Sequence, residues 1–263
     1  MVNTVAPETA LWPAHHAVAY LPGSLPMGGV VPMTPVYAFS QEPVALRLQS
    51  QPDLQPVRRD IALGGLLAFV IDQVLSPDEA DAMVVATERL GYRDAAPGIV
   101  TPPGMRMNKS VHWLADLGFM ESLARRIAPL LPGDIDGIPL FGHLSQRVNM
   151  YRYDAQDVFN RHTDGDWPGY GLSPRRDQML QWPDSLRSCL TMLLYLNGAR
   201  DGVQGGDTRL FRPDGAYVDV SPVKGSALFF RHGFGPGSVL HEGRQVSGAV
   251  SKYVARINVM YGQ

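Results

Sequence analysis

The chain contains only one cysteine, Cys189, among its 263 residues. A single thiol excludes an intrachain disulfide framework, the usual staple of small secreted proteins. Because this cysteine lies in an apolar segment, we expect it to be a small buried residue of the core. The sequence also lacks an apolar run of transmembrane length and the charged and apolar segments of a signal peptide. We therefore expect a cytoplasmic protein without a membrane partner.

An excess of charge of either sign is absent as well. The chain has 23 lysines and arginines against 25 aspartates and glutamates, which gives a formal net charge of −2. Proteins that bind nucleic acid commonly carry a basic excess, so the composition argues against a nucleic-acid partner. The hydrophobic content of 45% and the charged content of 18% are typical of a globular protein with one sizeable core. Nothing in these totals indicates an oligomeric state.

The chain divides into an N-terminal arm and a longer domain. Residues 1–55 are rich in proline, alanine, valine and glycine, and we expect an extended arm packed on or covering the core. Residues 56–263 form the predicted domain. Within it, residues 76–79, Ser-Pro-Asp-Glu, have the N-cap serine, first-turn proline and glutamate of a capping box, so a helix is predicted to run to Leu90. A second helix is predicted over residues 117–131.

Most of the remaining sequence has the pattern of short strands separated by turns that contain glycine and proline. This pattern is typical of barrels and of jelly rolls made of two sheets. The predicted fold class is therefore mainly β with flanking helices. The predicted strands are 61–70, 147–153, 190–196, 217–220, 227–230, 239–242 and 253–260.

A histidine and an aspartate separated by one residue, His162 and Asp164, are central to the functional prediction. In an extended segment, residues i and i+2 point to the same face, so the imidazole and the carboxylate project together. His241, in the segment Val-Leu-His-Glu-Gly, is a candidate third ligand, and His232 is an alternative by spacing. Two histidines and one carboxylate on one face of an octahedron bind ferrous iron and leave positions open for substrate chemistry.

Further segments lie around this pair in a recognisable order. They are Arg-Tyr at 152–153, Leu-Leu-Tyr-Leu-Asn at 193–197, Gly-Gly-Asp-Thr-Arg-Leu-Phe at 205–211, Pro-Val-Lys-Gly-Ser-Ala-Leu-Phe-Phe at 222–230, His-Glu-Gly at 241–243 and Lys-Tyr-Val-Ala-Arg-Ile-Asn-Val-Met-Tyr at 252–261. In these segments the chain resembles the Fe(II)/2-oxoglutarate dioxygenases, most closely their prolyl-4-hydroxylase-like branch. The resemblance covers roughly residues 140–261 and implies a double-stranded β-helix, or jelly-roll, core. It also implies that His162, Asp164 and His241 bind Fe(II), with 2-oxoglutarate and O2 as co-substrates.

The same resemblance implies a buried cation for the distal carboxylate of 2-oxoglutarate, because the keto acid end chelates the metal. Lys252 and Arg256 are four residues apart on one predicted strand, so both can face inward. Lys252 is the preferred anchor, since it is close to the position of the basic residue in prolyl hydroxylases. Arg256, however, belongs to an Arg-Ile-Asn segment that resembles the Arg-x-Asn motif of the AlkB group. Further candidates for this pocket are Tyr153, Tyr195 and Thr208.

Substrate contacts are predicted from position alone. One candidate shares a strand face with Tyr153, two follow a Pro-Pro-Gly turn, and three lie in the long segment 165–186, which is rich in aromatic residues and arginine. These candidates are Tyr151, Arg106, Asn108, Trp167, Arg175 and Trp182. By contrast, His112 and His143 lie outside the matching segments and are expected to be structural.

The reaction implied by the resemblance is hydroxylation, desaturation or ring closure, with release of succinate and CO2. The presence of Asp164 argues against a halogenase, because halide coordination normally requires that this carboxylate be missing. We expect a small-molecule substrate, such as an amino acid or a biosynthetic intermediate. The alternatives are prolyl hydroxylation of a protein, AlkB-like demethylation of nucleic acid, and 2-oxoglutarate sensing without turnover.

Overall fold

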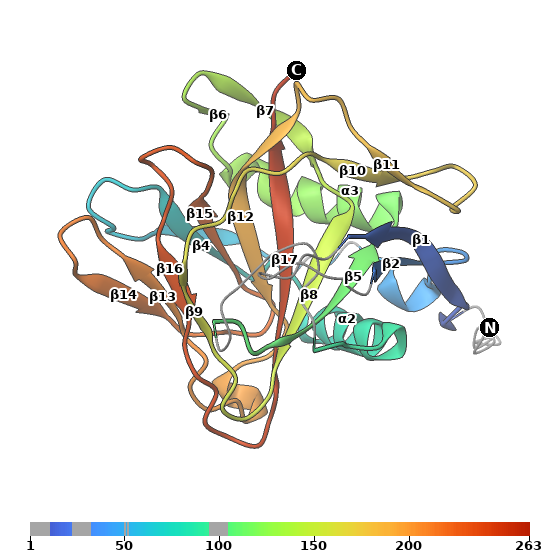
Figure 1. Cartoon of the computed structure of the whole chain (residues 1–263), viewed down its shortest axis with the longest axis horizontal. Coiled ribbons are helices and arrows are strands. Elements are labelled where there is room, and N and C mark those ends of the chain that lie inside the picture. The colour runs from blue at the N-terminus through green and yellow to red at the C-terminus, as the bar shows by residue number, and fades with distance from the viewer. Residues whose placement is uncertain (1–10, 23–32, 50, 52, 95–104) are drawn as a thin grey trace.

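The structure is a computed structural model, and it describes residues 11–22, 33–49, 51, 53–94 and 105–263. Within these residues, eleven strands form a large mixed sheet and four form a smaller antiparallel sheet (Figure 1). The large sheet consists of β1 (His15–Leu21), β2 (Thr34–Phe39), β3 (Val57–Asp60), β4 (Ala68–Asp72), β5 (Lys109–Leu114), β6 (Asp134–Ile135), β7 (Ile138–Leu144), β8 (Arg147–Tyr153), β12 (Arg187–Tyr195), β15 (Ala227–Arg231) and β17 (Lys252–Tyr261). The smaller sheet consists of β9 (Phe159–His162), β13 (Thr208–Phe211), β14 (Tyr217–Val220) and β16 (His241–Gly243). A separate hairpin pairs β10 (Tyr170–Leu172) with β11 (Met179–Gln181), and two short 3-10 helices are η1 (Val44–Leu46) and η3 (Ala199–Asp201).

The two sheets share a hydrophobic core. It contains Tyr151 and Val254 from the large sheet and Leu210 from the smaller one. Two sheets that enclose a common interior are the arrangement of a double-stranded β-helix. The predicted fold class, mainly β with flanking helices around such a core, is confirmed.

Helices cover the other face of the large sheet. They are α2 (Pro77–Leu90) and α3 (Leu117–Ile127), and α3 continues as the 3-10 helix η2 (Ala128–Leu130). The predicted capping box is present, because the Ser76 hydroxyl accepts a hydrogen bond from the Glu79 amide at 3.3 Å and the Glu79 carboxylate accepts one from the Ser76 amide at 2.9 Å. Both predicted helices are therefore confirmed.

The side-chain alternation of the central strands separates a structural face from a functional face. On β8, Val148 and Met150 belong to the core beneath the helices, whereas Tyr151 and Tyr153 belong to the core between the sheets. Successive side chains of a strand point to opposite faces, so every second residue of β8 and β17 faces the interior between the sheets. That interior face contains the polar residues of the candidate site.

The predicted strands 147–153 and 217–220 coincide with β8 and β14, whereas the strand predicted over 61–70 is largely wrong. Only its last residues belong to β4, because Gly64 and Gly65 have positive φ angles of 66° and 89° and reverse the chain there. The expectation for Cys189 is also corrected, since this residue is half-buried and packs at the margin of the core beneath the helices.

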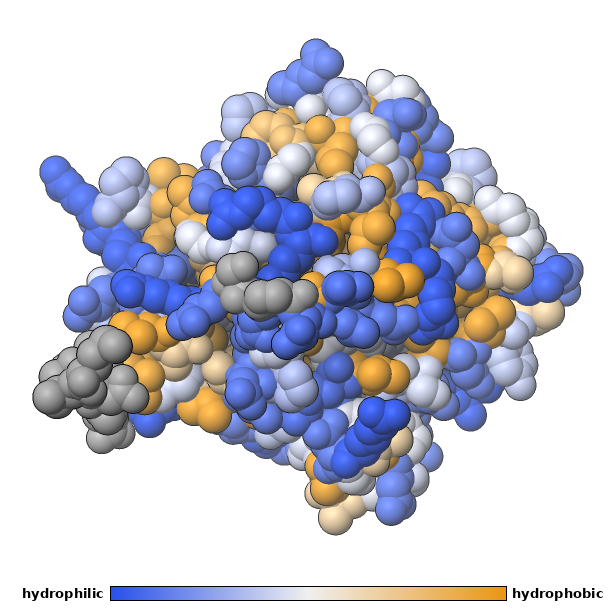
Figure 2. All heavy atoms as spheres, turned by 180° about the vertical axis from the view of Figure 1, so that it is seen from behind, coloured by the Kyte–Doolittle hydropathy of each residue, from blue (hydrophilic) through white to orange (hydrophobic). Residues whose placement is uncertain are grey.

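The N-terminal arm contributes β1 and β2 to the large sheet. Strand β2 pairs in parallel with β5, so the arm extends the sheet beyond its central strands. The domain boundary after residue 55 stays a prediction. Among the described helices, none combines the length and hydrophobicity that crossing a bilayer requires. Figure 2 shows the molecule from the side opposite to Figure 1, with hydrophilic side chains interspersed among hydrophobic ones.

Candidate metal centre and adjoining pockets

Strand pairing brings the three predicted metal ligands together. His162 ends β9, and His241, the first residue of β16, lies directly opposite it in the antiparallel register. The His162 Nε2 atom is 3.9 Å from Asp164 Oδ1, and the His241 Nε2 atom is 4.0 Å from Asp164 Oδ2. One ligand atom from each residue lies within 4.8 Å of the other two. This spacing fits a single metal ion bound by two imidazoles and a carboxylate.

Both imidazoles are oriented by backbone carbonyls. His162 Nδ1 donates to the Asn160 carbonyl oxygen at 2.7 Å, and His241 Nδ1 donates to the Val239 carbonyl oxygen at 3.0 Å. A carbonyl only accepts, so Nδ1 has the proton and the Nε2 lone pair is free for a metal. Burial lowers the pKa of His162 to about 3 and also lowers the pKa of His241, so both rings are neutral, as metal ligation requires.

Two donors hold the Asp164 carboxylate through one of its oxygens. Thr191 Oγ1 donates to Asp164 Oδ2 at 2.6 Å, and Arg256 Nε donates to the same oxygen at 3.0 Å. Burial alone would raise the pKa of Asp164, but the surrounding charge interactions, with Arg256 the largest of them, together outweigh it and keep that pKa below its ordinary value. The carboxylate is therefore ionised and fixed in orientation.

His232, the alternative third ligand, has a different place. Its Nδ1 atom lies 2.7 Å from Thr191 Oγ1, and its Nε2 atom lies 2.8 Å from Ser188 Oγ. Because the threonine hydroxyl donates to Asp164, it accepts from His232. His232 therefore supports the aspartate through Thr191, and it is not part of the converging set of ligand atoms.

A buried lysine faces a pocket beside this triad. Lys252 is the first residue of β17, lies opposite Tyr153 in the register and has an exposed fraction of 2%. Its Nζ atom donates to the Gly206 carbonyl oxygen and lies 5.1 Å from the ring centroid of Tyr153 and 5.5 Å from that of Tyr195. Lys252, Tyr153 and Thr208 line the pocket, whose wall also includes the three metal-ligand candidates.

The remaining members of this predicted set lie close by. The Tyr195 hydroxyl donates to Thr208 Oγ1 at 2.8 Å. Tyr195 itself does not line the pocket, but it positions Thr208, which does. Gly206 has a φ of 73°, and a Cβ there would lie 3.0 Å from Lys252 Cδ. A glycine thus allows the lysine to pass the backbone. Arg256 also lines the pocket, but one of its donors is already bound to Asp164.

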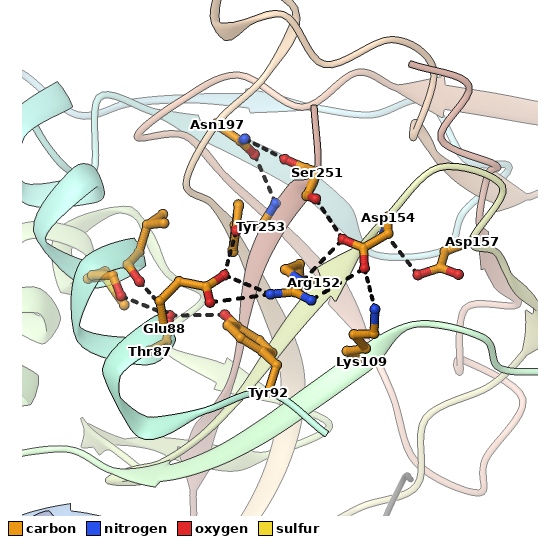
Figure 3. Close-up of polar contacts among 12 residues, drawn as sticks. Thr87, Glu88, Tyr92, Lys109, Arg152, Asp154, Asp157, Asn197, Ser251 and Tyr253 are labelled. Carbon is orange, nitrogen blue, oxygen red and sulfur yellow. Dashed lines mark hydrogen bonds and ion pairs between the residues drawn. The ribbon is translucent and has the colours of Figure 1, made fainter. Parts of the chain in front are cut away.

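A polar network lies on the face of the large sheet opposite to the pocket (Figure 3). It joins the end of β8, which contributes Tyr153, to the start of β17, which contributes Lys252. Arg152 donates to the Glu88 carboxylate at 3.0 and 3.2 Å and forms an ion pair with Asp154 at 3.1 Å. The Ser251 hydroxyl donates to Asp154 at 2.6 Å, and the Tyr253 hydroxyl donates to Glu88. The end of β8 is therefore tied to the start of β17 and to helix α2.

A second cavity adjoins the triad and shares His162 and Asp164 with the first. Of the residues predicted to contact substrate, Arg106, Tyr151 and Trp167 line it. The Arg106 guanidinium lies over the rings of Tyr151 and Phe159, at 4.8 and 4.9 Å from their centroids. Asn108 does not line the cavity, but its Oδ1 atom accepts a hydrogen bond from Arg106 Nε at 3.2 Å.

Two predicted substrate residues lie outside this cavity. The Trp182 ring packs on the backbone just before β10, so closely that a Cβ at Gly169 would be 2.1 Å from it, and it also contacts the ring of Phe141. Trp182 is therefore occupied in packing. Arg175 is exposed in the turn between β10 and β11. Position in a long segment did not indicate where either side chain points.

Several residues of this cavity were missed from the sequence. They are His112, Arg147, Asn149 and Asn258, and they line the cavity together with Arg256. For β8 and β17 a usable signal existed, because every second residue of a strand shares one face. The alternation that groups Tyr151 with Tyr153 also includes Arg147 and Asn149. His112, expected to be structural, lies on β5 opposite Asn149 in the register.

Comparisons with known proteins agree with this geometry. Residues 148–260 match the family described as the 2OG-Fe(II) oxygenase superfamily. The fold is similar to that of a viral collagen prolyl hydroxylase from Paramecium Bursaria Chlorella virus-1 in complex with 2OG, with a TM-score of 0.50 and 18% identity over 77% of this chain and 99% of that one. It is also similar to a prolyl hydroxylase from Trichoplax adhaerens in complex with a hypoxia inducible factor peptide fragment, with a TM-score of 0.51 and 18% identity over 74% and 83% of the two chains. No curated protein matches the sequence significantly. At this identity, the two structures establish the fold alone.

Proposed function

We propose that the chain oxidises a small molecule at an iron held by His162, Asp164 and His241. Residues 148–260 match the family model of the 2OG-Fe(II) oxygenase superfamily, whose members use Fe(II), 2-oxoglutarate and O2. When bound, the iron supplies the oxidation of a substrate C–H bond, coupled to conversion of 2-oxoglutarate to succinate and CO2. The chain's own residues hold the metal, orient the co-substrate and position the substrate.

The observation that supports this proposal is the convergence of the three side chains in the correct ionisation states. Two neutral imidazoles present free Nε2 atoms, and one ionised carboxylate lies 3.9 and 4.0 Å from them. Each ligand has a partner that fixes its orientation: Asn160, Val239 and Thr191. Such outer partners are typical of built metal sites.

For the co-substrate, Lys252 is the proposed anchor of the distal carboxylate. Its ammonium is buried in the pocket beside the triad, and no carboxylate of the described residues pairs with it. Tyr153 faces the same pocket and adds a hydroxyl near the proposed carboxylate position. Arg256 is less suited to this role, because its Nε atom is bound to Asp164. We propose that Arg256 instead orients the metal-binding carboxylate.

The proposal of a small-molecule substrate is supported by the second cavity. Buried polar atoms of Arg147, His112 and Asn258 converge on it from neighbouring strands and lack hydrogen-bond partners. A compact polar molecule can reach such atoms at the bottom of a cavity. Hydroxylation is the proposed outcome, with desaturation and ring closure as products of the same centre.

Substitution of the iron ligands tests the proposal. His162→Ala and His241→Ala should each abolish the visible charge-transfer absorption that an anaerobic Fe(II)–2-oxoglutarate chelate gives, and should also abolish succinate formation. His143→Ala is the matched control, because that histidine is exposed and lies outside both pockets. Retention of the absorption in either ligand variant would refute the assignment of the metal site.

A further inference from the structure

The cavity beyond the metal centre has an uncompensated positive charge. Three guanidinium groups line it, those of Arg106, Arg147 and Arg256. The only carboxylate among the described lining residues is Asp164, which is bound to Arg256 and is one of the three metal-ligand candidates. Neither Arg106 nor Arg147 has an ion-pair partner among the described residues. A metal ion in the site would add to this positive charge.

Each of the three guanidinium groups has an unused donor. Arg106 Nη2, Arg147 Nε and Arg256 Nη2 are buried and have no hydrogen-bond partner. Burial of an unpaired cation is costly, and burial indeed lowers the pKa of Arg147 below its ordinary value. Such donors are retained where an anion binds, because planar guanidinium groups match the two oxygens of a carboxylate.

The same cavity also has two unused acceptors. His112, which is 3% exposed, has its Nδ1 atom 2.7 Å from the Asn149 side-chain oxygen, so Nδ1 donates and Nε2 retains a lone pair. The ring is neutral, because burial, followed by the charge of Arg147, lowers its pKa to about 3. Asn258, which is 8% exposed, has an unpartnered Oδ1 atom. Both atoms can accept a hydrogen bond from a ligand.

From this combination we infer that the substrate is a small carboxylic acid that also has an N–H or O–H donor, as amino acids and hydroxy acids do. Arg106 and Arg147 bind its carboxylate, while His112 and Asn258 accept from its amine or hydroxyl group. The rings of Tyr151, Phe159 and Trp167 line the rest of the cavity and enclose its apolar part.

This inference rests on the proposed function in one respect: 2-oxoglutarate, itself a dianion, must occupy the Lys252 pocket. The two pockets are separate at their far ends, since Lys252 and Thr208 line only the first and Arg106 and Arg147 only the second. They meet at His162, Asp164 and Arg256, which line both. A substrate anchored by Arg106 and Arg147 would therefore lie beside the metal without displacing the co-substrate.

Binding without turnover tests the inference. The full chain is loaded with Mn(II) and 2-oxoglutarate in the absence of O2, and calorimetry then measures the affinity for L-amino acids and 2-hydroxy acids. Each acid is paired with its carboxamide and with the parent acid that lacks the amine or hydroxyl group. The best acids should bind at least about tenfold more tightly than their amides, because a hydrogen bond to a charged group is lost in the amide.

Arg106→Gln and Arg147→Gln should each weaken acid binding by roughly tenfold to a hundredfold while leaving amide binding within about twofold. Arg209→Gln is the matched control, because this arginine pairs with Asp219 on the smaller sheet, away from both pockets, and it should change neither affinity. Two arginine variants are used so that a folding defect in one does not decide the result.

The possible outcomes distinguish a failure of the inference from a failure of the proposed function. If 2-oxoglutarate fails to bind the wild-type protein, the proposed function fails. If 2-oxoglutarate binds but acids and amides have equal affinity, the assignment of a carboxylic acid as the substrate is overturned. The same holds if inorganic phosphate binds more tightly than every acid. Equal affinity of substituted and parent acids would overturn the assigned amine or hydroxyl group.

Discussion

The buried lysine of the proposed co-substrate pocket should make 2-oxoglutarate binding depend on pH. Lys252 is 2% exposed, and burial lowers its pKa from 10.5 to about 8. That difference corresponds to about 3 kcal/mol by which the pocket disfavours the charged ammonium. A bound carboxylate stabilises the charged form and so raises this pKa. Binding above pH 8 therefore takes up a proton and weakens as the pH rises.

The magnitude follows from the fraction of protein in which Lys252 is charged. With a pKa of about 8, roughly nine tenths of the molecules have the ammonium at pH 7 and roughly one tenth at pH 9. If only the charged form binds the distal carboxylate, the dissociation constant of 2-oxoglutarate should rise about tenfold between these two pH values. His162 does not contribute in this range, since its pKa of about 3 leaves it neutral throughout.

Anaerobic calorimetric titration of 2-oxoglutarate into the Mn(II)-loaded protein from pH 7 to 9 measures this change. Lys252→Arg should bind with an affinity that hardly varies over the range, because a guanidinium stays charged. Lys224→Met is the control, since this lysine forms surface ion pairs with Asp81 and Asp201, and it should reproduce the wild-type profile. A wild-type affinity that is constant with pH, or a Lys252→Arg profile that still falls tenfold, would refute the reasoning.

Two further substitutions test how the fold supports the site. Thr191→Val removes the hydroxyl that donates to Asp164 at 2.6 Å, and it should weaken Fe(II) binding by roughly tenfold to a hundredfold in a chelator competition assay; an unchanged affinity would mean that the hydroxyl does not orient the ligand. Ser76→Ala removes the capping box of α2, and it should lower the free energy of unfolding in urea by about 1 kcal/mol while leaving 2-oxoglutarate binding unchanged. A loss of 2-oxoglutarate binding in Ser76→Ala would contradict the assignment of a purely structural role to this cap.

Local signals were sufficient for much of the fold. The capping box at Ser76 and the alternation of residues 147–153 specify a helix start and a strand through short-range preferences alone, and both are observed. The strand predicted over 61–70 failed because two glycines with positive φ outweigh the apolar composition there. Backbone conformation at a glycine depends on surrounding contacts that composition does not describe.

The sequence predicted only those residues of the candidate site that have a recognisable type or spacing. His162 and Asp164 are such residues, because their separation places both on one face of an extended segment. His112 is not, since its role arises from the pairing of β5 with β8, a contact between segments far apart in sequence. Trp182 illustrates the converse, because its ring packs against the backbone at Gly169 and Gly171, a contact that its position in the sequence does not indicate. Which strands become neighbours is a property of the whole sheet.

The ten-residue strand β17 (Lys252–Tyr261) sets the distance between the two proposed binding sites of the interior. Lys252, Arg256 and Asn258 lie on one face of this strand. The backbone rise of roughly 3.3 Å per residue therefore separates the proposed co-substrate anchor, Lys252, from Asn258 on the substrate side by about 20 Å. Insertion of a single residue between them would turn every later side chain to the helix-covered face. We therefore expect that a change of substrate specificity would occur by exchange of side chains along β17, without a change in the length of the strand.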